Sequence, residues 1–170
     1  LNRELRVRQM ITRATATADG QFIALPTDWL EGRNVQVGGD DPYPLAFVTM
    51  DRADLIRASQ PSGDPLYYTI MGDRMEFLPD APSDGIEIEM VYYASIPPIA
   101  TNVTNWLSEL WPSLYIYGSL VHSAPYLKDD DRVAVWESQY RAALERARLA
   151  DSRAQYSGAP LKMRSATTFG

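Results

Sequence analysis

Hydrophobic residues recur at every second position in the first part of the chain and at every third or fourth position afterwards. A period of two is typical of strands with one buried face, whereas steps of three and four are typical of helices. The change follows Pro97 and Pro98, which end the strand pattern because proline lacks the N–H that a sheet requires. The pattern predicts an α+β fold, with an antiparallel β-sheet or small sandwich over residues 12–96 and a helical part over residues 104–154.

Two turn signals in the β-rich part predict hairpins. The segment TRATATADGQFIALP alternates small and polar residues, turns at Asp19 and Gly20, and resumes with apolar residues. The segment PLYYTIMGDRMEFLP places Gly72 and Asp73 between two runs rich in β-formers. Both residue types accept the positive φ of a tight turn, so we expect each segment to fold back on itself.

The remaining β-rich segments predict further strands and two short helical pieces. PTDWLEG predicts a helical turn that begins at Pro26 and ends at Gly32, and residues 51–59 predict a two-turn helix. NVQVGG and YPLAFVTM predict one strand each. DGIEIEMVYYASIP alternates regularly and predicts a strand with one apolar face, formed by Ile86, Ile88, Met90 and Tyr92.

Three helices are predicted after the prolines. TNWLSELW predicts a short helix capped by Thr104 or Asn105, and Pro112 suits the first position of the next. That next helix, residues 113–127, is apolar on nearly every side, which predicts burial on more than one face. The last helix, residues 130–154, is amphipathic and about 35 Å long at the usual rise, so we expect surfaces outside its own domain to use that length. Its apolar face carries Val133, Trp136, Tyr140, Ala143, Leu144, Ala147 and Ala150.

Composition and charge exclude several classes of function. The net charge of −6 argues against a broad phosphate-binding face, because nucleic-acid affinity comes from clustered lysine and arginine. The chain has no cysteine, which excludes disulfides and thiolate zinc sites. No apolar run approaches the roughly 20 residues that a membrane span needs. Along the last helix, Glu137 with Arg141 and Glu145 with Arg148 have the spacing of ion pairs.

The residues that could carry chemistry have structural explanations. His122 is the only histidine and lies in the most apolar segment, which favours a packed, hydrogen-bonded side chain over a metal ligand or a base. A Ser-His-Asp arrangement, and with it a hydrolase, stays compatible with the sequence, although a Gly-x-Ser-x-Gly motif is absent. The acids at 129–131 could bind a divalent ion, but capping of the last helix is favoured. We therefore predict no catalytic, cofactor or metal site.

An alternative function is a carbohydrate- or ligand-binding β module. Tyrosines and tryptophans could form a sugar platform, with Tyr67 and Tyr92 as candidate residues. Glu87 and Glu89 share a strand face, as glycosidase carboxylates could. Most aromatic residues nevertheless fall at positions that face the predicted core, which favours a packing role.

The last residues of the chain predict an arm. Residues 157–170 contain glycine, proline, serine and threonine without periodicity, yet they keep several apolar side chains. We interpret this segment as an extended C-terminal arm that follows a single α+β domain over residues 1–156 and binds a partner. The predicted partner-binding residues are Leu161, Met163, Arg164 and Phe169.

The series QFIALPTDWL, PLYYTIMGDRMEFLPDAP, IEIEMVYYASIPPI and NWLSELWPSLYIYGSLVHSAPYLKDDDRVAVWESQYRAALERA resembles the head-to-tail adaptor (connector) proteins of tailed bacteriophages. It is similar in outline to the tail tubular protein A of short-tailed phages. The resemblance covers residues 2–165, and residues 105–136 are its most specific part. The family's upstream helix is missing, so we expect that sequence before Leu1 has been lost.

The resemblance implies a structural virion protein rather than an enzyme. Such adaptors are expected to form a homo-oligomeric, dodecameric ring in the virion neck, where they connect the portal protein to a tail or nozzle protein. Double-stranded DNA would pass through without specific binding, and an acidic lining would let it slide. The subunits would be made in the cytoplasm of the host bacterium, with no membrane partner. The arm would dock on the portal or on a neighbouring subunit.

Overall fold

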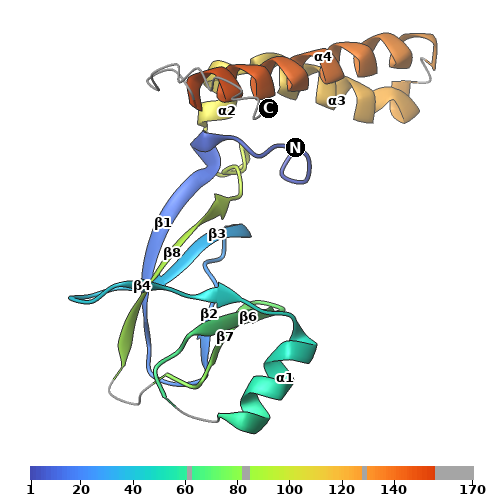
Figure 1. The fold of residues 1–170 in the computed structure, drawn as a ribbon. Coiled ribbons are helices and arrows are strands. Elements are labelled where there is room, and N and C mark those ends of the chain that lie inside the picture. The colour runs from blue at the N-terminus through green and yellow to red at the C-terminus, as the bar shows by residue number, and fades with distance from the viewer. Residues whose placement is uncertain (61–62, 82–84, 128–129, 156–170) are drawn as a thin grey trace, which may run out of the picture. The chain divides into compact units, whose positions relative to one another are not determined.

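The computed structural model describes residues 1–60, 63–81, 85–127 and 130–155 (Figure 1). The chain divides into two compact units, Leu1–Pro97 and Pro98–Gly170. Among the described residues, the strands all lie in the first unit, and the second unit contains three helices. The predicted α+β fold, with its change of structure after Pro97, is confirmed. That residues 1–156 act as a single domain followed by an arm stays a prediction.

The β-rich unit consists of two four-stranded sheets. The first sheet has the order β1-β8-β3-β4, with β1 at Ile11–Ala18, β8 at Ile86–Ala94, β3 at Trp29–Val37 and β4 at Tyr43–Pro44. The second has the order β2-β7-β6-β5, with β2 at Phe22–Ala24, β7 at Arg74–Leu78, β6 at Tyr67–Met71 and β5 at Ala46–Phe47. Neighbouring strands are antiparallel except β5 and β6, which run parallel.

The chain passes from one sheet to the other at both edges. At Asp19 and Gly20 it leaves β1 in the first sheet and enters β2 in the second, so these strands do not pair with each other. The predicted hairpin is therefore wrong, although the turn lies where the sequence places it. YPLAFVTM likewise forms two short strands, β4 and β5, in different sheets, instead of the single strand predicted.

The segment PTDWLEG forms a turn and the start of a strand, which corrects the predicted helical turn. The N–H of Trp29 donates to the carbonyl of Pro26 at 3.0 Å, and β3 begins at Trp29. A Cβ atom at Gly32 would lie 3.0 Å from Cζ2 of the Trp29 ring. Gly32 thus makes room for the tryptophan ring and does not end a helix.

The other strand predictions are confirmed. β6 and β7 form the expected hairpin, and Gly72 in its turn has a φ of 61°. NVQVGG contributes the end of β3. β8 buries Ile88, Met90 and Tyr92 on one face, as its alternation predicts. The two-turn helix is α1, Met50–Ser59.

The core of this unit lies between the two sheets. Its largest buried side chains are contributed by strands of both sheets, namely Phe77, Met75, Ile88, Met90 and Val35. A smaller cluster lies under α1, where Ala53 and Ile56 pack with Leu78. The second sheet is therefore covered on both faces, by the first sheet and by α1.

Leu1, Leu5 and Val7 have the spacing of the tail of an amphipathic helix, but in the structure the opening residues do not continue as an α-helix. The N–H groups of Glu4 and Leu5 both donate to the carbonyl of Leu1 at 3.0 Å, which closes one turn. A three-residue 3₁₀ helix, Arg8–Met10, follows and leads into β1.

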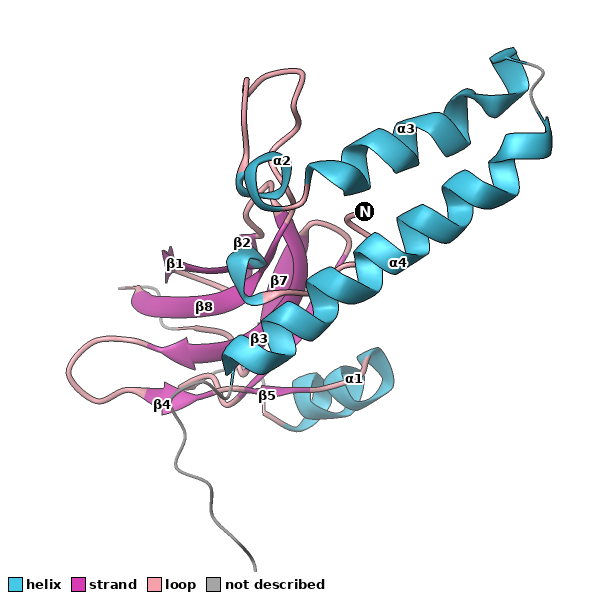
Figure 2. Ribbon diagram, turned by 90° about the horizontal axis from the view of Figure 1, so that it is seen from above, coloured by secondary structure: helices cyan, strands magenta, loops and turns pink. Residues whose placement is uncertain are grey.

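The helical unit contains α2 (Trp106–Leu110), α3 (Pro112–Leu127) and α4 (Asp130–Gln155). The Oδ1 of Asn105 accepts from the backbone N–H of Ser108 at 2.8 Å, and the Ser108 hydroxyl accepts from the N–H of Asn105 at 3.0 Å. Of the two candidates, Asn105 is thus the cap of α2. Helices α3 and α4 lie side by side and antiparallel (Figures 1 and 2), with the Tyr140 ring over Gly118.

The predicted ion pairs of α4 are confirmed. Arg141 pairs with Glu137, and Arg148 contacts Glu145 at 2.6 Å. All four side chains are largely solvent-exposed, so each pair contributes only a few tenths of a kcal/mol. The length of α4 is therefore stabilised mainly by packing against α3.

Candidate functional site

His122 lies exposed on α3. The prediction that it is packed inside the protein is wrong, because α3 buries Leu114 and Ala124 and leaves the side chain of His122 in solvent. Among the residues that the structure describes, no group of three or more metal-binding side chains comes together. Asp129 and the side chains of Asp130 and Asp131 lie outside the described part, so helix capping by these acids stays a prediction.

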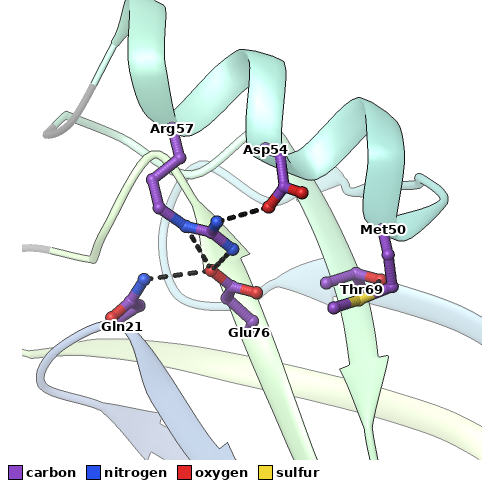
Figure 3. A network of polar contacts seen from close by, with 6 residues as sticks. All are labelled: Gln21, Met50, Asp54, Arg57, Thr69 and Glu76. Carbon is purple, nitrogen blue, oxygen red and sulfur yellow. Dashed lines mark hydrogen bonds and ion pairs between the residues drawn. The ribbon is translucent and has the colours of Figure 1, made fainter.

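A polar network joins α1 to the second sheet (Figure 3). Glu76 on β7 is fully buried, and its Oε1 accepts from Nη2 of Arg57 at 2.6 Å and from Nε of the same side chain at 3.1 Å. Nε2 of Gln21 donates to the same oxygen at 3.0 Å. Nη1 of Arg57 donates to Oδ1 of Asp54, one turn earlier on α1, at 2.6 Å. A buried carboxylate is thus held by a cation and an amide.

The electrostatics of this network indicate a structural role. The hydrogen bonds to Glu76 and then to Asp54 raise the pKa of Arg57, so the cation is permanent. The Oε2 atom of Glu76 has no hydrogen-bond partner among the described residues and is buried. At the other end of α1, the Thr69 hydroxyl contacts Sδ of Met50 at 3.7 Å. A carboxylate held in this way fixes α1 on the sheet.

Tyr92 is part of the core and does not form an open platform. Its ring stacks on Trp29 with centroids 4.7 Å apart, and its hydroxyl donates to Oδ1 of Asp28 at 2.8 Å. Only 3% of Tyr92 is exposed, so its face cannot receive a sugar. Tyr67 is half-buried against the cluster under α1. The two tyrosines proposed for a ligand-binding module therefore stabilise the fold.

The stability of the β-rich unit should fall at alkaline pH through Tyr92. Burial, then the hydrogen bond and charge of Asp28, raise the pKa of Tyr92 from 10.0 to about 12. Because the folded form holds the proton of Tyr92 more tightly than the unfolded form, this group adds to the free energy of unfolding. That added stability is complete below pH 10 and is lost as the pH rises through about 12. Urea unfolding between pH 9 and 11.5 should show a steeper fall for the wild type than for Tyr92→Phe.

The matched control for this effect is Tyr126→Phe, because Tyr126 is 88% exposed on α3. Its pH dependence should follow that of the wild type. An identical slope for Tyr92→Phe and the wild type would show that the buried hydroxyl is not the titrating group.

Glu89 belongs to a polar row on the outer face of the first sheet. Its Oε2 accepts from Nε2 of Gln36 on β3 at 2.8 Å and pairs with Arg13 on β1 at 3.2 Å. The row crosses three neighbouring strands. A carboxylate neutralised in this way suits a surface ladder better than a glycosidase pair, which requires a second carboxyl across a bound sugar.

The helical unit leaves large apolar side chains uncovered. Those more than half exposed are Val103, Leu110, Ile116, Tyr126, Val135 and Leu149. The prediction that α3 is buried on more than one face is wrong for the single chain, since Ile116 is 56% exposed. On α4, Val135 and Leu149 lie two heptads apart and therefore close to the same face. Val135 and Leu149 are therefore candidates for contact with other chains, where apolar side chains gather on one surface.

The charge divides unevenly between the two units. Residues 1–97 carry fifteen acidic and eight basic side chains, a net charge of −7, whereas residues 98–170 carry seven acidic and eight basic side chains, a net charge of +1. The acidic balance of the protein thus comes from the β-rich unit. The predicted partner-binding residues Leu161, Met163, Arg164 and Phe169 lie outside the described residues, and their role stays a prediction.

The sequence model of a protein family, described as SU10 adaptor protein, matches residues 1–164. The match defines the class: the protein is a structural component of the phage virion, a head-tail adaptor, and not an enzyme. The chain belongs to the SU10 adaptor protein family. The resemblance that the sequence suggested is confirmed. No match was found among curated proteins.

Adaptor function fits the distribution of residues in the structure. An adaptor implies partners in the virion neck, and the uncovered apolar side chains are exposed to contact with other chains. None of the described helices combines the length and hydrophobicity needed to span a membrane. The buried polar clusters around Glu76 and Tyr92 then serve to hold the building block rigid.

Proposed function

We propose that this protein is one subunit of a ring that connects the portal to the tail in the virion neck and lets DNA pass. The family match over residues 1–164 carries the proposal. The ring is dodecameric, as the resemblance to known adaptors implies, with the portal protein on one side and a tail or nozzle protein on the other. Its subunits are made in the cytoplasm of the host bacterium.

The apolar surface of the helical unit supports a ring of identical subunits. Val135 and Leu149 are 59% and 55% exposed, and a ring interface would remove them from water. A closed ring requires two different complementary surfaces on each subunit. The long helix α4 offers one such surface over about 39 Å at the usual rise of its 26 residues.

The charge of the β-rich unit supports passage of DNA without specific binding. Its net charge of −7 repels phosphates, and no lysine lies in residues 1–97. A channel wall of like charge keeps the duplex from adhering while it moves. The fourteen-residue arm at 157–170 then holds the ring to its neighbours, through Leu161, Met163, Arg164 and Phe169 docked on the portal or on the next subunit.

The proposal is tested by measuring the mass of the full chain alone and after mixing with the portal protein. We expect a ring-sized species, at least in the presence of portal. Val135→Asp combined with Leu149→Asp should abolish that species, because both charges would enter the subunit interface. Ser138→Asp combined with Ser152→Asp is the matched control on exposed polar positions of α4 and should leave it intact. A chain that stays monomeric with portal would contradict the ring.

Deletion of residues 157–170 tests the arm. Particles that carry the shortened chain should fail to join heads to tails, whereas the ring species formed by α3 and α4 should persist. Normal joining by the shortened chain would show that the arm does not dock.

A further inference from the structure

β1 has an open outer edge. It lies at the end of the first sheet and pairs with β8 over its whole length, from Ile11 opposite Tyr93 to Ala18 opposite Ile86, without a shift. Apart from the N–H of Ile11, which donates to the carbonyl of Arg8, no backbone hydrogen bond of β1 is found outside the ladder with β8 among the described residues. An edge strand of eight residues therefore has one side without a partner strand.

The register shows which groups face outward. The N–H of Gly38 donates to the carbonyl of Glu87, so the backbone of Glu87 faces β3. Because backbone groups of successive residues point to opposite sides of a strand, those of Ile88 face β1. Ala16, the partner of Ile88, thus faces β8. The N–H and C=O groups of Arg13, Thr15 and Thr17 therefore point away from the sheet.

This edge lacks the features that usually prevent strand addition. Natural edge strands are protected by proline, bulges, inward charges or short length. β1 contains no proline and no register shift. The side chain of its only charged residue, Arg13, lies on the sheet face away from the core and pairs with Glu89. The inward-facing Ala14 and Ala16 are small and only half-buried at the rim of the core. The edge can therefore accept both the backbone and the larger side chains of an added strand.

We propose that residues 161–169 of a neighbouring copy add as a strand to the outer edge of β1. The proposal rests on the proposed ring and names the acceptor of its arm. Leu161, Met163 and Phe169 occupy alternate positions, so in an extended segment they share one face, and Lys162 and Arg164 share the other. Between the end of α4 at Gln155 and this strand, residues 156–160 supply an extended linker of at most about 17 Å.

Both faces of the arm match this edge. The apolar face would cover the rim of the core beside Ala14 and Ala16, where small side chains leave space. The basic face would lie on the outer surface of the sheet, beside Thr15 and Thr17 of β1, with Glu87 and Glu89 one strand further away on β8. Residues 152–170 contain no acidic side chain, whereas the unit that carries β1 has a net charge of −7. Charge complementarity thus favours this segment over a second β1 strand.

The test uses single cysteines, because the chain has none of its own. Full-length Thr15→Cys and Ser165→Cys proteins are mixed, assembled with portal, and treated with a short bifunctional maleimide. We expect a covalent dimer in the mixture and not in either variant alone. Asn102→Cys replaces Thr15→Cys as the control for an exposed position elsewhere and should give no dimer with Ser165→Cys.

A second measurement separates backbone pairing from side-chain contact. Successive N–H groups of a strand point to opposite sides. Arg164→Pro with Ser165→Pro therefore removes one N–H donor on each side of the arm, whereas Arg164→Ala with Ser165→Ala keeps both donors. Urea unfolding of both pairs is compared with that of the wild type, so that a loss of overall stability is told apart from a loss of pairing. Hydrogen exchange of β1 in the assembled ring should become fast with the proline pair and stay slow with the alanine pair.

The outcomes distinguish this inference from the proposed ring. Rings without a Thr15–Ser165 cross-link would overturn strand addition and leave the ring intact. A covalent dimer from Thr15→Cys alone would indicate pairing of two β1 strands and would also overturn it. A cross-link within one chain of the double variant, without one in the mixture, would refute exchange between copies. Absence of any ring would refute the proposed function itself.

Discussion

Replacement of Arg57 with alanine will lower the free energy of unfolding by about 3 kcal/mol. The substitution leaves the fully buried carboxylate of Glu76 without its cation, and the Gln21 amide alone cannot compensate for the lost solvation. The side chain of Arg57 is 38% exposed, so water can reach Glu76 once the guanidinium is removed. The loss of unfolding free energy therefore lies at the lower end of the range for a broken buried ion pair. Equilibrium unfolding in urea at pH 7 measures it.

Two further variants show whether the buried charge is the cause. Asp54→Ala removes only the exposed partner of Arg57 and should change the free energy of unfolding by less than about 1 kcal/mol. Glu76→Gln in the Arg57→Ala background should recover part of the loss, because an amide has no charge to solvate. If the double variant were less stable than Arg57→Ala alone, the loss would arise from packing instead.

Phe77→Ala will lower the free energy of unfolding by about 3–5 kcal/mol. Phe77 is fully buried between the sheets, beside Tyr68 in the register of β6 and β7, and its removal leaves a cavity that rigid strands cannot close. The same urea experiment applies, followed by circular dichroism in the aromatic region.

Phe47 offers the matched control, since its ring contacts the same Tyr68 but is 58% exposed. Phe47→Ala should cost less than about 1 kcal/mol, because most of its surface is already in water. Equal losses from the two substitutions would mean that the core does not lie between the sheets.

The sequence predicts strands and their local turns better than their partners. The hairpin of β6 and β7 is predictable because Gly72 and the flanking runs are adjacent in the chain. The turn at Asp19 and Gly20 looks the same locally, but β1 pairs with β8, whose residues lie far along the chain. A turn signal shows where the direction changes and does not show which strand lies alongside.

Gly32 shows how a correct local cue can have another cause. A glycine six residues after Pro26 has the spacing of a short helix with a start and a stop signal. In the structure its lack of a side chain accommodates the ring of Trp29, which stacks on Tyr92 from a different strand. The tertiary contact, which a local pattern does not contain, decides the conformation.

The sequence does not predict the buried ion pair between Glu76 and Arg57. Glu76 stands between Met75 and Phe77 in a strand, where alternation predicts a carboxylate in solvent, and only Leu78 on the same face indicates that this face is covered. Its partner Arg57 lies 19 residues earlier on a helix, at a distance that only the packing of α1 on the sheet reveals. His122 shows the opposite error, since apolar neighbours predicted burial for a side chain that points into solvent.

The position of β8 has a consequence for synthesis of the protein. β8 is the last strand of the chain, yet it lies between β1 and β3 in the first sheet. Before residue 86 has been added, β1 has no neighbour in this sheet and β3 has only the two-residue strand β4, so the edges that later pair with β8 stay exposed. A truncated product that ends before this strand cannot complete the sheet, so the first sheet forms only once β8 has been synthesised.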